Sequence, residues 1–165
     1  MKPFNTLTRI ILPLFFTGIF SMGARAQESL IKTTIDSRQF IFKAESAIPS
    51  GGNSRPLSSG YDLVINKSML RASLPYFGKT FGTPTDIDNG GFQFTSMSYT
   101  YNRTDGKKGG WEINIKPDDA RDISSINLTI YEDGNANLEI NSIQRGSISY
   151  TGHIAALKSR NKAHS

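Results

Sequence analysis

Apolar and polar residues alternate with a period of two over most of this chain. Segments such as Trp111–Lys116 and Asn137–Asn141 place their apolar side chains on one side of a strand and their polar side chains on the other. By the same pattern we expect strands at 40–45, 61–66, 69–74, 92–101, 111–116, 126–131, 137–141 and 147–154. A polar face is typical of antiparallel sheet, and no helix long enough for a parallel crossover separates these segments. The sequence therefore predicts a mainly β fold, a single antiparallel β domain of about eight strands.

The segment 92–101 departs from this alternation. Its apolar side chains stand at even positions in Phe92–Phe94 and at odd positions in Met97–Tyr101, so one flat strand cannot bury both sets on one face. A bulge or sharp bend around Thr95 and Ser96 would restore the register. Such bends occur where a strand turns a corner, so we expect a curled sheet, a sandwich or a barrel-like form.

The composition fits one globular domain without disulfide bonds. The chain has 165 residues and no cysteine, which excludes a disulfide-stapled miniprotein. A domain of this length buries roughly two-thirds of its unfolded surface and needs no staple. The 15 glycines, 7 prolines, 10 phenylalanines and 6 tyrosines favour strands and turns over helices.

The first 26 residues have the pattern of a secretory signal peptide. A positively charged start precedes the apolar run 10–20, and the small residues Ala24 and Ala26 stand at the two positions that a signal peptidase reads. Cleavage is expected between Ala26 and Gln27. The alternative, an uncleaved transmembrane anchor, is disfavoured because the run is shorter than the roughly 20 residues that span a bilayer. Without a cysteine to carry a lipid, the mature chain is expected in the periplasm or outside the cell.

The rest of the chain divides into three parts. Apolar residues at helical spacing predict a short helical lead-in at 27–37, with the helix over Glu28–Asp36 and Ser29 as a possible cap. The antiparallel β domain is expected at 38–155, and 156–165 is expected to be a basic, flexible tail.

The formal net charge of +5 does not indicate nucleic-acid binding. The leader and the tail each carry three basic residues and no acidic one, which leaves the body, 27–155, with a net charge of −1. Nucleic-acid recognition needs a basic stripe on a folded face. We therefore expect no nucleic-acid partner.

The chain lacks the residue sets of the common catalytic and metal sites. Its two histidines, His153 and His164, are too few for a histidine-based zinc site, and no G-x-S-x-G elbow exists. Residues 86–90 resemble the opening of a calcium loop, but the glycine stands at position five and Met97 occupies the place of the bidentate glutamate. We predict no metal, no cofactor and no catalytic residue. Paired carboxylates in the cluster at 118–122 keep a hydrolase open as an alternative.

Two connections, 47–60 and 75–91, are longer than hairpins require, and long loops in compact domains are often functional. The second loop begins with Tyr76 and Phe77, whose rings either plug an open end of the sheet or form an aromatic anchor for a partner or a sugar. Arg55 and Lys79 are the basic residues of the two loops. Tyr76, Phe77, Lys79 and Arg55 are therefore the predicted ligand- or partner-binding residues.

Several motifs together resemble a known family. They are Phe40-x-Phe42-x-Ala44, Tyr61-x-Leu63, Leu74-Pro75-Tyr76-Phe77-Gly78, Gly90-Gly91-Phe92-x-Phe94, Trp111-x-Ile113 and Ser149-Tyr150-x-Gly152. LPYFG followed by GGFxF is the most specific part. Over about residues 38–155 the chain resembles a family of secreted Bacteroidota proteins known only as a domain of unknown function, number four-two-five-one. The resemblance implies an exported domain from a Bacteroidota bacterium and carries over no catalytic residues.

Export, an all-β scaffold, two long loops and the missing catalytic sets favour a non-catalytic periplasmic or secreted binding module. Its partner would be an envelope protein or a glycan, with no nucleic acid and no membrane span after cleavage. The alternatives are a carboxylate-dependent hydrolase and an envelope-structural protein without a small ligand.

The leader gives the first testable prediction. Secretion should release a product whose first residue is Gln27, because the small residues at 24 and 26 direct the peptidase to that bond. N-terminal sequencing or intact-mass measurement of the exported protein checks this. A product that begins far from Gln27 would contradict the assignment.

Overall fold

The structure, a computed structural model, describes residues 22–78, 90–107 and 109–157. These residues form one helix and ten strands. The elements are α1 (Met22–Ser37), β1 (Phe40–Pro49), β2 (Arg55–Pro56), β3 (Asp62–Asn66), β4 (Met69–Leu74), β5 (Phe92–Ser96), β6 (Tyr99–Asp105), β7 (Trp111–Pro117), β8 (Ile123–Ile130), β9 (Asn135–Ser142) and β10 (Ile148–Ala156).

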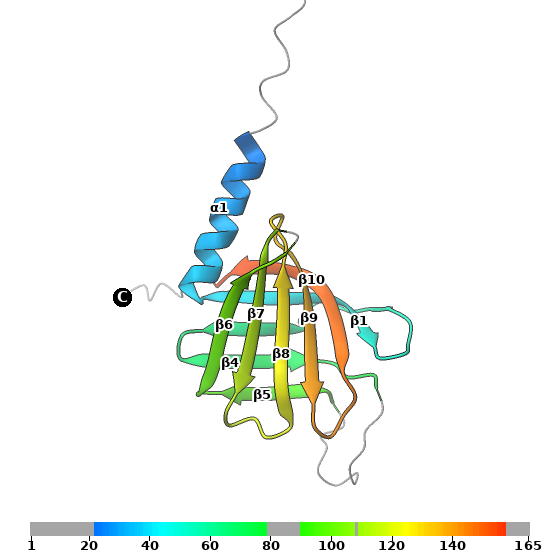
Figure 1. The fold of residues 1–165 in the computed structure, drawn as a ribbon. Coiled ribbons are helices and arrows are strands. Elements are labelled where there is room, and N and C mark those ends of the chain that lie inside the picture. Colours follow the sequence, from blue (N-terminus) through cyan, green and yellow to red (C-terminus); the bar gives the residue numbers. More distant parts are fainter. Residues whose placement is uncertain (1–21, 79–89, 108, 158–165) are drawn as a thin grey trace, which may run out of the picture.

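All strands belong to one antiparallel sheet that is nearly closed into a barrel. Its order is β5-β4-β3-β1-β10-β9-β8-β7-β6, and β2 pairs with β1. Figure 1 shows β6 to β9 running across β1, β4 and β5, which lie behind them, while β10 bends and runs alongside β1. The predicted mainly β, antiparallel and barrel-like fold with an N-terminal helix is confirmed, with ten strands in place of about eight.

The barrel interior is filled by the inward positions of the alternating strands. Phe42, Leu63, Ile126, Leu138 and Ile140 are fully buried. Strand β7 alternates strictly between buried and exposed residues over its whole length, as the sequence pattern predicts. The alternation of buried and exposed residues therefore has a simple cause: one face of every long strand packs against the opposite wall of the barrel.

The two crossed halves of the sheet meet where β1 pairs with β10. The register shifts between Ala44 and Ser46, so Glu45 is the extra residue of a β-bulge. After the bulge the buried positions change from even to odd numbers, which keeps both Ala44 and Ala47 inside. Opposite the bulge, a Cβ on Gly152 would lie 1.9 Å from the carbonyl oxygen of Lys43. Only glycine permits this close approach, and the sheet turns its corner there.

The segment expected as one strand at 92–101 is two strands at opposite ends of the sheet order. β5 ends at Ser96, the chain bends at Met97 and Ser98, and β6 starts at Tyr99. Ser96 is buried, and its hydroxyl donates to the carbonyl of Ser98 at 2.7 Å. The predicted sharp bend is present two residues further along, and Met97 is exposed rather than buried because it lies in the bend.

Helix α1 packs onto the barrel through its C-terminal half. Ile35 is fully buried, and Asp36 forms an ion pair with Arg103 of β6. The helix begins at Met22, ahead of the expected start, because Ala, Arg and Gln residues before Glu28 continue a helix readily. The prediction that Ser29 caps the helix is wrong: its carbonyl accepts the Thr33 hydroxyl inside the helix. No helix within 22–78, 90–107 and 109–157 is long and apolar enough to cross a membrane.

Replacement of Gly152 by alanine should cost about 1–3 kcal/mol of unfolding free energy, because the new methyl group would push against the β1 backbone. Urea unfolding measures the loss. The matched control is Gly146→Ala, where a Cβ would meet only the Tyr76 hydroxyl at an ordinary 3.5 Å and should change stability by less than about 0.5 kcal/mol. Equal stability of the two variants would show that the corner does not need its glycine.

Candidate functional site

Three loops meet at one end of the barrel and enclose a pocket of about 470 Å³, here called the loop pocket. The connection after β1, the LPYFG segment after β4 and the β9–β10 turn each contribute to its wall. The pocket is lined by Pro49, Ser50, Gly51, Gly52, Asn53, Arg55, Tyr76, Phe77, Gly78, Gly146 and Ser147. Its size lies within the range of ~300–1,000 Å³ that is usual for small-molecule sites.

An exposed cation–aromatic pair lies in the loop pocket. The Arg55 guanidinium lies over the ring of Phe77, with its central carbon 5.2 Å from the ring centroid. Phe77 is 39% exposed, and Arg55 is exposed as well. An apolar ring and an Arg charge at the surface are the residue types that carry most binding energy in protein interfaces.

Tyr76 has a different role from its neighbour Phe77. It is half-buried against the core, and its ring meets the edge of Phe92 with the centroids 5.4 Å apart. Burial raises the pKa of the Tyr76 hydroxyl, and a backbone hydrogen bond with Gly146 partly offsets that shift. A Cβ on Gly78 would lie 2.2 Å from the same hydroxyl, so any larger residue there would force the Tyr76 side chain to shift. Tyr76 thus anchors the segment that presents Phe77.

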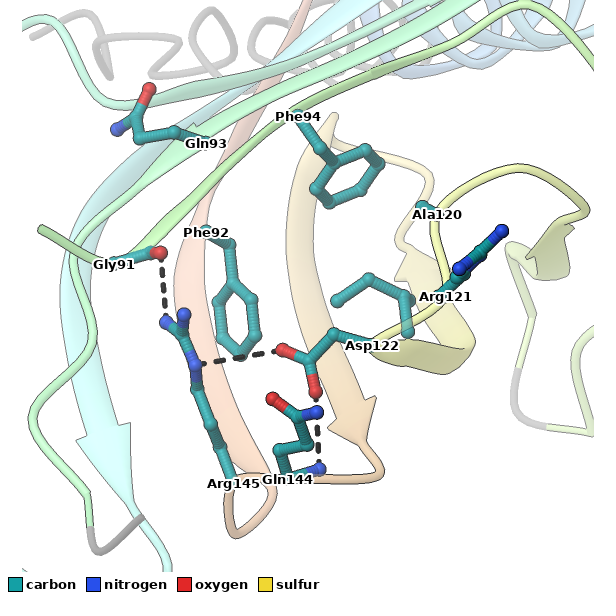
Figure 2. A pocket seen from close by; sticks show the side chains of 10 residues that line it. Gly91, Phe92, Gln93, Phe94, Ala120, Arg121, Asp122, Gln144 and Arg145 are labelled. Atoms are coloured by element: carbon teal, nitrogen blue, oxygen red, sulfur yellow. Dashed lines mark hydrogen bonds and ion pairs between the residues drawn. The ribbon is translucent and has the colours of Figure 1, made fainter. Parts of the chain in front are cut away.

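Arg145, in the β9–β10 turn, ties the loops of this end together. It is only 8% exposed, and its Nη1 donates to the carbonyl of Gly91 at 2.8 Å. Its guanidinium lies over the rings of Tyr76 and Phe92, 5.5 and 5.1 Å from their centroids. Figure 2 shows the side chain reaching from the turn past Phe92 to Gly91.

The charge of Arg145 is balanced by Asp122, the residue that precedes β8. Nε of Arg145 lies 3.5 Å from Oδ2 of Asp122, and within the described residues this buried nitrogen makes no hydrogen bond. The other carboxylate oxygen of Asp122 accepts the backbone N–H of Gln144 at 3.0 Å, as Figure 2 shows. The same oxygen also accepts the Ser142 hydroxyl at 2.6 Å. Beside the pair lies a smaller pocket of about 210 Å³, bounded by Phe92, Phe94 and Ala120 among others.

The start of the LPYFG segment is fixed from inside the barrel. The fully buried Tyr150 of β10 donates its hydroxyl to the carbonyl of Pro75 at 2.7 Å. Burial raises the pKa of this hydroxyl far above its usual value, so Tyr150 stays a donor at every physiological pH. The loop pocket therefore rests on side chains that the core holds in place.

The structure brings three of the four predicted binding residues together. Arg55, Tyr76 and Phe77 all line the loop pocket, although they come from two separate loops. Lys79 lies outside the described residues, as do the leader up to residue 21 and the calcium-like segment up to Asn89. Arg145 was missed, because a single arginine in a polar turn carries no sequence signal of burial.

The residues of the predicted cleavage site lie in α1. Ala24, Ala26 and Gln27 all belong to this helix, and the side-chain amide of Gln27 donates to the carbonyl of Asp133 at 2.8 Å. Cleavage after Ala26 stays a prediction.

The carboxylates considered for a hydrolase hold the bend between β5 and β6. Asp118 accepts the Ser98 hydroxyl at 2.7 Å, and Asp119 accepts the backbone N–H of Met97 at 3.0 Å. Hydrogen bonds from Ser96 and from the Met97 backbone hold the pKa of Asp119 below its usual value. In the described part of the chain, no group of three or more His, Cys, Asp and Glu side chains is placed to hold a metal ion.

A family model for a domain of unknown function, DUF4251, matches residues 24–154. The chain belongs to the DUF4251 family. A solved structure with a similar fold is the crystal structure of a DUF4251 family protein from Bacteroides eggerthii DSM 20697 at 1.95 Å resolution, with 18% sequence identity, a TM-score of 0.58, and coverage of 79% of this chain and 88% of the other. Among proteins with curated descriptions, none matches. The predicted family is confirmed; the DUF4251 match does not test LPYFG and GGFxF as its signature or a Bacteroidota source, which stay predictions.

Replacement of Arg145 by methionine should lower the unfolding free energy by about 2–4 kcal/mol, because it leaves the half-buried Asp122 carboxylate and the Gly91 carbonyl without their partner. Thermal or urea unfolding measures the change. Arg121→Met is the control, since Arg121 borders the same small pocket but is exposed. If both variants unfold alike, Arg145 does not tie the loops together.

Proposed function

We propose that this DUF4251 protein is an exported, non-catalytic binding module of a Bacteroidota envelope, and that it captures its partner at the loop pocket. The observation that carries the proposal is the solvent-facing pair of Arg55 and Phe77, which two loops bring to 5.2 Å from each other. Export rests on the leader pattern of the first 26 residues.

The support beneath the pair is rigid, which favours binding. Tyr76 beside Phe77 packs on Phe92 and Arg145, and the preceding Pro75 accepts the buried Tyr150 hydroxyl. A preformed surface loses little conformational entropy when a partner docks, so more of the contact energy appears as affinity.

The chemistry of the loop pocket defines the partner it fits. Phe77 offers an apolar face, while Arg55 offers charged N–H donors that suit a carboxylate or another oxygen acceptor. Ser50, Asn53 and Ser147 add polar groups along the wall. An envelope protein or a glycan that presents an apolar group next to an oxygen acceptor meets these requirements.

The test separates Phe77 from the structural residues around it. Tagged protein is expressed in a Bacteroidota host, cross-linked and purified, as wild type and as the single variants Phe77→Ala and Arg55→Ala. Both side chains are exposed, so both variants should keep the wild-type melting temperature. A partner that co-purifies with the wild type should be lost, with an affinity at least about tenfold weaker when remeasured with pure components.

Tyr131→Ala is the matched control. Tyr131 is an exposed aromatic residue at the other end of the barrel, 42% accessible, and its loss should leave binding unchanged. A partner list that is the same for wild type and both pocket variants would overturn the proposed site. Turnover of a glycan, peptide or ester that disappears in Asp118→Asn or Asp119→Asn would overturn the non-catalytic assignment in favour of a hydrolase.

A further inference from the structure

A second pocket, which shares no lining residue with the loop pocket, lies on the outer wall of the barrel. Its floor is a row of side chains on three adjacent strands: Lys43 of β1 pairs with His153 of β10 on one side and with Asp62 of β3 on the other. Phe42 and Ala44 are buried, so Lys43 between them points outward. The volume is about 470 Å³. We call it the wall pocket.

The segment 57–61 forms the rim of the wall pocket and is fixed to β1 at both ends. The backbone N–H of Leu57 donates to the carbonyl of Glu45 at 2.8 Å, and the N–H of Ala44 donates to the carbonyl of Tyr61 at 3.0 Å. Leu57 and Tyr61 line the pocket and also pack against the core. The pocket thus has a fixed apolar side opposite a polar floor.

The bulge in β1 completes the floor. Glu45, the extra residue of the bulge, places a carboxylate oxygen 2.8 Å from Nδ1 of His153. A carboxylate only accepts hydrogen bonds, so Nδ1 of His153 carries a proton and donates it to Glu45. Bulges commonly re-aim a side chain in this way next to a binding site.

A further acceptor in the wall pocket lacks a hydrogen bond. Oδ1 of Asp62 is buried, and in the described part of the chain it makes no hydrogen bond, although it forms an ion pair with Nη2 of Arg71 at 3.6 Å. The Asp62 side chain is 25% exposed, and a carboxylate has a second oxygen, so Asp62 can still accept a hydrogen bond from a ligand in the pocket.

These groups define the ligand. The wall offers the carboxylate acceptors of Glu45 and Asp62 and the ring of His153, while Lys43 and the hydroxyls of Ser58 and Ser59 are its donors. Two carboxylates disfavour an anion, and the central Lys43 disfavours a cation. A neutral ring that carries hydroxyls and has an apolar C–H face matches both the polar floor and the side formed by Leu57 and Tyr61.

We propose that the wall pocket binds a neutral saccharide ring through Glu45, His153 and Asp62. The proposal is independent of the loop pocket, since the two sites share no residue. The Phe77→Ala variant must therefore bind the saccharide as the wild type does. A negative result at one site does not overturn the proposal for the other site.

The test is a two-dimensional amide NMR titration of the isotope-labelled protein with glucose, galactose, mannose and N-acetylglucosamine, each added alone. At least one sugar should shift the amide signals of Lys43, Tyr61 and His153 in a saturable way. Glu45→Gln and Asp62→Asn should each weaken that sugar's affinity about tenfold or more, the effect of one charge-assisted hydrogen bond.

Glu139→Gln is the matched control, because Glu139 is also an exposed glutamate on an outward strand position but lies outside the wall pocket. It should bind the sugar with wild-type affinity. The absence of saturable shifts with all four sugars would overturn the proposal. Shifts that occur elsewhere, or that persist at wild-type affinity in both pocket variants, would overturn it too.

Discussion

The rest of the structure depends on the close contact between β1 and β10. These strands pair along their whole length, and they join the β3–β5 half of the sheet to the β6–β9 half. We call the β1–β10 pairing the seam. If the two strands paired here without a bend, the sheet would stay open and one apolar face would be exposed to solvent. Gly152, with no Cβ in the way of the Lys43 carbonyl, and the bulge at Glu45 together let the sheet turn back over itself. The apolar faces of both halves are then buried against each other.

Both proposed sites depend on the corner that Gly152 and the bulge at Glu45 form between β1 and β10. β10 carries Tyr150, whose hydroxyl holds Pro75 and so positions the segment that presents Phe77. The same bulge turns the Glu45 carboxylate onto His153 and completes the floor of the wall pocket. A change at the seam would therefore disturb two surfaces that share no residue, whereas a change at either surface would leave the barrel intact.

The sequence predicted the barrel well and the contacts between distant segments poorly. Period-two alternation located the long strands, because burial of one face is a local property of each strand. The bend at Met97 and Ser98 was predicted because the apolar positions change there from even to odd numbers, although the predicted bend lay two residues too early. The loops that carry Arg55 and Phe77 were predicted from their length and composition. Arg145 was not found, since its burial depends on tertiary contacts with Gly91 and rings elsewhere in the chain.

Native-state hydrogen exchange tests the central claim, that the β1–β10 seam holds the barrel together. The account predicts that the paired amides at 40–44 and 152–156 exchange only through global unfolding, with an opening free energy equal to that from urea unfolding. Amides of β5 and β6, at the ends of the sheet order, should open locally at lower free energy. Exchange of the β1 and β10 amides through local opening, faster than in the β7–β8 ladder, would contradict the account.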